Sequence, residues 1–160
     1  MRATLGSQVT VIATEVWRAD IAAGRGFVGG GGQGAVGGAY SYVQLLNPNA
    51  SGKTARIRQA IVVVSGADTV YLKSYSTALA TDDGAVANLQ VGSAAGVCHA
   101  RHTSDAGVLG TLMATFSFAA AGMLQLGPDW FAEVPANQGI MFMDATVNKS
   151  LICSFFLSEY

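Results

Sequence analysis

From Ala39 onward the chain is a series of short strand-like segments divided by turn residues, and this pattern restricts the fold more than any other feature. Val70 and Leu72 fall on one face of such a segment and Tyr71 on the other, and residues 111–118 alternate in the same way. We count roughly eight to ten strands, spaced as in a sandwich or barrel. Strands and helices do not alternate, which argues against a parallel α/β sheet. The sequence therefore predicts an all-β, antiparallel β-sandwich.

The shortage of charge indicates that the protein associates with other subunits. Charged residues make up 12% of the 160 residues and hydrophobic residues 51%, whereas about 25% of a typical domain is charged. We find no apolar run of about 18 residues and no signal-peptide pattern, so we expect no membrane partner. Low charge is typical of obligate interfaces, which predicts a homo-oligomer. The alternative is that the many Ala and Gly residues inflate the hydrophobic score.

The net charge argues against a nucleic-acid-binding protein, and the cysteine count argues against a disulfide-rich one. The net charge is −1 and the pI about 6.0, so no basic surface for nucleic acid is expected. Cys98 and Cys153 lie in strand-like segments, where buried free thiols are the usual state. Two cysteines make no disulfide framework, although a bridge between them stays open.

Residues 1–38 lack the strand pattern of the rest of the chain. Glu15–Ala23 is the best helix candidate, with Gly24 as its C-cap. The glycine-rich residues 24–38 are expected to form a flexible joint, since glycine accepts any backbone conformation. We therefore divide the chain into an arm, residues 1–38, and a β-sandwich domain, residues 39–160. The apolar residues of the arm are its expected contacts to a neighbouring subunit or a larger assembly: Val9, Val11, Ile12, Val16, Trp17 and Ile21.

The octet NPNASGKT, residues 47–54, ends like a phosphate-binding loop. Such a loop needs a glycine at its first position and a helix after it, but Asn47 occupies that position. Residues 55–64 are rich in Ile and Val, which favour a strand. Without a helix N-terminus no amide groups converge on a phosphate. The octet therefore predicts a turn, and no nucleotide cofactor is expected.

No catalytic or metal-binding residues are predicted. In the segment Cys98–His102, Cys98 and His102 share one strand face and His99 lies on the other, whereas zinc needs about four ligands. We expect a polar patch or subunit contact here. The run 102–105 places His, Ser and Asp too close together for a catalytic triad, and no Gly-x-Ser-x-Gly motif occurs.

Carboxylate pairs such as those of glycosidases remain a hypothesis that spacing cannot test. The candidates are Asp129 with Glu133 and Asp144 with Glu159. Asp82-Asp83-Gly84 lacks the spacing of a calcium loop and predicts a turn. We expect neither enzymatic activity nor a cofactor.

Two segments, YVQLLNPNASGKTARIRQAIVVV (42–64) and PANQGIMFMDATVNKSLICSFFLSEY (135–160), resemble small bacteriophage virion proteins. In that group a Tyr-x-Gln-Leu-x-Asn-Pro strand and a Ser-Gly-Lys-Thr turn lead into an apolar strand, and a Thr-Val-Asn segment precedes the last strand. The matching residues are Tyr42, Gln44, Leu45, Asn47, Pro48, Ser51 to Thr54, Pro135, Gly139 and Thr146 to Asn148. The resemblance implies a sandwich of jelly-roll type, often trimeric, that decorates capsids or builds head fibres or tail parts.

Two functional hypotheses follow from this resemblance. The first is a capsid decoration (cement) protein, assembled in the host cytoplasm, that binds the major capsid protein as a homotrimer. The second is a tail or head-fibre protein that binds a host glycan through loops 77–96 and 127–139. Aromatic residues are candidate interface or glycan contacts, with core packing as the alternative: Tyr71, Tyr75, Trp130 and Phe131. A cellular jelly-roll lectin or scaffold is a third possibility.

Overall fold

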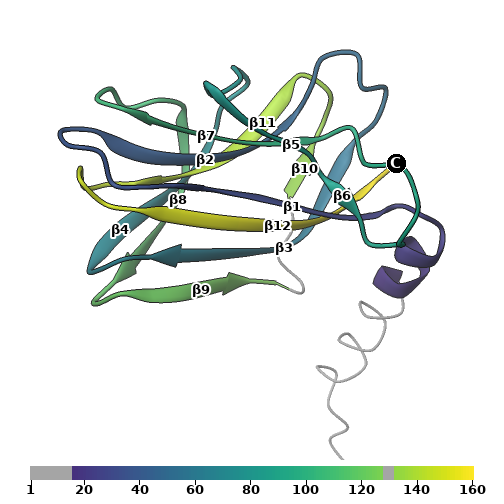
Figure 1. Cartoon of the computed structure of the whole chain (residues 1–160), viewed down its shortest axis with the longest axis horizontal. Coiled ribbons are helices and arrows are strands. Elements are labelled where there is room, and N and C mark those ends of the chain that lie inside the picture. The colour runs from purple at the N-terminus through teal and green to yellow at the C-terminus, as the bar shows by residue number, and fades with distance from the viewer. Residues whose placement is uncertain (1–15, 128–131) are drawn as a thin grey trace, which may run out of the picture.

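The computed structural model describes residues 16–127 and 132–160, which contain one short helix, residues 16–22, and twelve strands (Figure 1). The helix lies within the segment expected to be helical, and Gly24, with φ of 70°, follows it as the expected C-cap. The strands are β1 (Gly26–Gln33), β2 (Tyr40–Asn47), β3 (Ala55–Val64), β4 (Asp68–Ser74), β5 (Thr81–Ala85), β6 (Ala87–Asn88), β7 (His99–Asp105), β8 (Thr111–Phe118), β9 (Gly122–Leu126), β10 (Ala132–Val134), β11 (Gln138–Asp144) and β12 (Leu151–Glu159).

The strands form two antiparallel sheets in the order of a jelly roll. In sheet A, β9 and β10 follow one another along one edge of β3, and β12, β1 and β6 lie beyond it. Sheet B has the order β5-β7-β2-β11-β4-β8. If β5–β7 and β10 are set aside, the sheets reduce to β1-β12-β3-β9 and β2-β11-β4-β8, the interleaved arrangement of a jelly roll. The prediction of an all-β antiparallel sandwich is confirmed.

The core lies between the sheets, where alternate residues of each strand point inward. Phe142 of β11 and Phe155 of β12 are fully buried and stack across the two layers, with ring centroids 5.9 Å apart. Cys98 and Cys153 also belong to this core, and both are free thiols. Burial raises the pKa of each thiol, so both are inert packing residues.

The octet 47–54 is a turn, as predicted, but it does not form a hairpin. It joins β2 in sheet B to β3 in sheet A, so the chain crosses from one layer to the other here. Ala50 and Gly52 have φ values of 62° and 66°, in the left-handed region. The Asn47 side chain donates to the carbonyl oxygens of Lys53 and Val134, which ties the turn to β10.

The glycine-rich segment differs from the expected flexible joint, because it forms strand β1. All eight residues of β1 pair with β12, so the sandwich begins at Gly26 and not at residue 39. Gly29 and Gly31 face inward, where a Cβ would collide with the side chains of Val86 and Asp83. The close contact between the sheets therefore requires glycine, and the entropic cost of ordering it is offset by packing.

Replacing Gly30 tests this close packing directly. A Cβ there would meet the Cys153 carbonyl oxygen, which is backbone and cannot rotate away. We expect Gly30→Ala to lower the free energy of unfolding by about 1–3 kcal/mol, the usual range for overpacking. Gly34→Ala is the matched control, since its Cβ would meet nothing within 4 Å. Urea denaturation midpoints give the comparison, and equal midpoints for the two variants would contradict the assignment.

The segment between β4 and β8 is more ordered than expected. Residues 77–96 were expected to form a loop, yet they contain β5 and β6. Asp82-Asp83-Gly84 was expected to be a turn, but it is a bulged part of β5 that pairs with β7. Cross-strand partners that lie far away in the sequence produce this order, and local composition does not reveal them.

Candidate functional site

A buried carboxylate holds the N-terminal helix against sheet A. Asp20 is 2% exposed, and its Oδ2 accepts hydrogen bonds from Arg58 Nη2 at 2.9 Å, Ser158 Oγ at 2.7 Å and Tyr160 Oη at 2.6 Å. Its Oδ1 accepts from Arg25 Nη2 at 3.0 Å. Burial alone would raise the pKa of Asp20, but these donors together hold it below its usual value.

The predicted contact residues of the arm lie in different environments. Ile21 packs on Gly26 of its own subunit, where a Cβ on the glycine would lie 2.6 Å from Ile21 Cγ1. Trp17 is half-buried and Val16 is exposed. Val9, Val11 and Ile12 lie outside the described residues. Asp20 was not predicted from the sequence, because nothing about a single acidic residue in a short helix indicates that four side chains will donate hydrogen bonds to it.

The side of the sandwich formed by β8 and β9 is open and uncharged. β8 is the last strand of sheet B, β9 lies at the edge of sheet A, and a short connection joins them. No charged residue occurs between Asp105 and Asp129. The core residues on these strands remain only partly buried: Ala114, Phe116, Phe118, Leu124 and Leu126. Edge strands are usually protected by charge or proline, so this edge is suited to be covered by another protein surface.

A row of exposed apolar side chains continues from this edge across the outer face of sheet A. Met123 of β9 pairs with Val63 of β3, Val63 with Ile152 of β12, and Ile152 with Gly32 of β1. Met123 is 63% exposed and Ile152 53%. We call the β8–β9 edge together with Met123, Val63 and Ile152 the apolar surface.

The outer face of sheet B is covered by the chain itself. A second, smaller core forms there from Tyr42, Leu79, Met141 and Met143. Tyr71 and Tyr75, the candidate interface or glycan contacts, are half-buried and pack against it. Gln44 holds the covering segment by donating to the carbonyl oxygens of Tyr75 and Thr77. Trp130 and Phe131, the other two aromatic candidates, lie outside the described residues.

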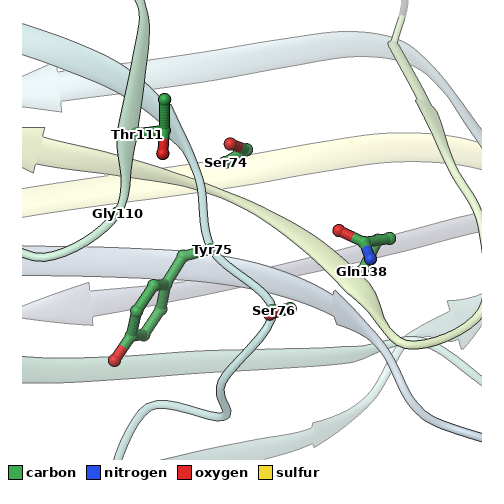
Figure 2. Close-up of a pocket in the computed structure, with 6 residues that line it drawn as sticks. All are labelled: Ser74, Tyr75, Ser76, Gly110, Thr111 and Gln138. Atoms are coloured by element: carbon green, nitrogen blue, oxygen red, sulfur yellow. The ribbon is translucent and has the colours of Figure 1, made fainter.

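A polar hollow of about 380 Å³ lies where β4, β8 and β11 meet (Figure 2). It is lined by Ser74, Tyr75, Ser76, Gly110, Thr111 and Gln138, and Figure 2 shows the Tyr75 ring pointing away from Gln138. A smaller hollow of about 140 Å³ shares Ser74 and Gln138 and adds Glu133 and Met113. Hydroxyl and amide groups of this kind hydrogen-bond sugars. Of the two loops predicted to bind glycan, 127–139 contributes Gln138 to both hollows and Glu133 to the smaller one, and 77–96 contributes no lining residue.

The segment Cys98–His102 divides into separate environments. His99 Nδ1 lies 3.0 Å from Asp82 Oδ1, and His102 Nδ1 lies 2.8 Å from Asp83 Oδ2, while Cys98 is in the core. Each histidine thus has its own carboxylate from β5. In residues 16–127 and 132–160, no cluster of three or more His, Cys, Asp or Glu side chains is placed to hold a metal ion.

The carboxylates suggested for glycoside hydrolysis do not come together. Asp144 ends β11 shortly before β12 begins, and Glu159 lies at the far end of β12. At about 3.3 Å per residue the strand separates them by roughly 25 Å, whereas the two carboxyls of a glycosidase lie within about 10 Å. Glu159 instead accepts hydrogen bonds from the backbone amides of Val97 and Cys98. Glu133 is exposed and paired with Arg56, and Asp129 lies outside the described residues.

Asp68 and Asp144 form a buried carboxyl pair at the opposite end of the sandwich from the helix. Asp144 is fully buried and Asp68 is 8% exposed. Among the described residues, both oxygens of Asp144 and Oδ2 of Asp68 have no hydrogen-bond donor. Burial first, and then the neighbouring Asp68, raise the pKa of Asp144 to about 7. A proton on Asp144 supplies the missing donor, because the protonated carboxyl can donate to the neighbouring Asp68.

No helix of the described chain has the length and hydrophobicity to cross a bilayer. Comparison with models of protein families, with curated proteins and with solved structures finds no match for this chain.

Proposed function

We propose that this protein is a non-enzymatic structural subunit of a bacteriophage virion that associates with its own copies and binds the capsid as a decoration protein. Its resemblance to small virion proteins supports the virion location and a trimeric state. The jelly-roll order of the strands agrees with that resemblance. The observation that carries the proposal is the uncharged open edge of β8 and β9.

Burial of this edge against another copy supplies the driving force. A standard interface covers about 800 Å² on each partner, and apolar area contributes roughly 25 cal/mol per Å² removed from water, offset by lost rigid-body freedom. Leu112 and Met113 on β8 are 56% and 53% exposed. The partly buried side chains of β8 and β9 gain further burial when a copy covers the edge. Such contacts repeated around a shell would clamp neighbouring capsid subunits.

A charge placed on the edge tests self-association. Thr115 is exposed on β8, so a lysine there does not disturb the core. We expect Thr115→Lys to weaken self-association at least ten-fold in sedimentation equilibrium, since an unpaired ammonium is costly to desolvate. Thr146→Lys, in an exposed turn, is the matched control. A full-length protein that sediments as a monomer would refute the proposal.

The polar hollow favours glycan binding at a tail or head-fibre position as a second candidate function. Its hydroxyl and amide groups are the chemistry that a sugar requires, and Gln138 is exposed at its rim. A decoration protein occurs at hundreds of copies in a particle, whereas a tail-tip protein occurs at a few, so copy number separates the candidates. Binding on a glycan array that Gln138→Ala abolishes would favour the second.

A further inference from the structure

A shallow groove runs over β1 on the outer face of sheet A. It has a volume of about 440 Å³ and is lined by Val28, Gly29–Gly31 and Ile152–Ser154. Gly30 and Gly32 point outward and are exposed, so this part of β1 presents bare backbone. Ile152 forms one wall of the groove and continues into the apolar surface through Val63. We call this feature the glycine groove; none of its lining residues is charged.

The chain's own packing does not require glycine at position 32. The three nearest atoms to a Cβ there would be Ile152 Cγ1 at 3.3 Å, the Leu151 carbonyl oxygen at 3.9 Å and Ile152 Cβ at 4.0 Å, so only the exposed Ile152 side chain would have to shift, by a few tenths of an ångström. Gly30, in contrast, is required by the backbone of β12. Glycine at an open position on a sheet face marks a place where another backbone approaches closely.

The N-terminal segment has the reach and composition to be that backbone. The helix that follows it is fixed on the same face, because Asp20 binds Ser158 in the row of β12 side chains that also contains Ile152. Extended, the fifteen residues before the helix span roughly 50 Å, while the groove begins at Ser154, about 13 Å from Ser158 along β12. Residues 3–14 carry no charge, and Val9 and Val11 alternate with Thr10.

We infer that the glycine groove binds the N-terminal segment, residues 3–14, of a second copy of this chain. This inference rests on the proposed self-association and names one of its contacts. A second copy is the occupant because the groove continues into the apolar surface, so that one neighbour covers both. Exchange of such a segment between copies joins subunits with little surface from the folded domains.

Sedimentation of full-length variants tests the contact. Ile152→Lys places a charge in the groove without touching the core, and deletion of residues 1–13 removes the occupant. We expect each to weaken self-association at least ten-fold, whereas Val91→Lys, at a position 99% exposed, leaves it unchanged. Because Ile152 also belongs to the apolar surface, the deletion variant decides: if it associates like the parent while Thr115→Lys does not, the inference fails and the proposed function stands. If the parent is a monomer, the proposed function itself fails.

Cross-linking decides whether the segment comes from another copy. The variants Val11→Cys and Ile152→Cys, which each add one thiol to the buried Cys98 and Cys153, are mixed under oxidising conditions, with Val91→Cys replacing Ile152→Cys as the control. We expect a disulfide between the two chains in the first mixture and not in the second. A disulfide that forms only within one chain carrying both substitutions would show that the segment covers its own groove, and would overturn the inference.

Discussion

Asp20→Ala is expected to lower the free energy of unfolding by about 3–5 kcal/mol, because it removes one partner of a buried, charge-assisted network. Arg58 and Ser158 would lose their shared acceptor at the end of sheet A. Arg25 and Tyr160 would lose the same carboxylate. Chemical denaturation gives the loss, and hydrogen exchange over residues 16–25 shows whether the helix has left the sheet.

The matched control for Asp20 is an ion pair on the surface. Arg56 Nη2 lies 2.6 Å from Glu133 Oε1, but both side chains are largely exposed. Glu133→Ala is expected to cost about 1 kcal/mol or less. Asp20→Asn keeps the shape of the side chain and loses its charge. Its loss in free energy of unfolding should therefore fall between those of Asp20→Ala and Glu133→Ala. Equal losses in Asp20→Ala and Glu133→Ala would show that the helix contributes nothing to stability.

Stability is expected to decrease as pH rises from about 5 to 8, because the pKa of Asp144 is higher in the folded protein than in the unfolded chain. Folding binds a proton in this range, and the stabilising contribution of the protonated carboxyl is lost as pH rises through about 7. One pKa unit corresponds to about 1.4 kcal/mol, so the rise from 3.8 to about 7 amounts to roughly 4 kcal/mol between acidic and alkaline conditions.

Other charged groups near the pair modify this slope without reversing it. Lys149 lowers the pKa of Asp144 in part, and the neighbouring Cys153 is a buried thiol with a raised pKa. Asp20 acts in the opposite direction, since its pKa is depressed and its contribution is lost only as pH falls below its usual range. Comparison of the parent with Asp144→Asn therefore isolates the contribution of the Asp68–Asp144 pair within the window from pH 5 to 8.

Asp144→Asn should abolish the slope and raise stability at pH 8. The asparagine amide is neutral and can donate to Asp68, so no second charge is buried when pH rises. Urea denaturation at pH 5, 6, 7 and 8 measures the effect. Asp105→Asn, at an exposed position, serves as the control and should keep the parent slope. A parent protein with equal stability across this range would contradict the raised pKa of Asp144.

Most strands of residues 39–160 were predictable from the sequence because the signals that mark them are local, and residues 77–96, which contain β5 and β6, are the exception. Period-two alternation in residues 69–75 and the turn residues of the octet are short-range signals, and the structure places strands and turns there. The helix at 16–22 was predictable for the same reason, since its C-cap glycine is adjacent in the sequence. Apolar composition and low charge likewise predict an association surface before any strand is placed in a sheet, and this stays a prediction.

The features that the sequence did not predict depend on contacts between residues far apart in the chain. The glycine-rich segment looks flexible by composition, yet it is strand β1 because β12 pairs with all of it and Val86 and Asp83 fill the space that side chains would need. Asp20 and Ser158 are 138 residues apart, and Asp68 meets Asp144 only when β4 and β11 pair. Alternation and turn chemistry are properties of neighbouring residues, so the sequence alone determined most strands from β2 onward but not β1, β5 or β6. Only tertiary contacts decided which strands pair, which glycines are needed and which carboxylates are buried, because burial and close approach arise when distant segments pack together.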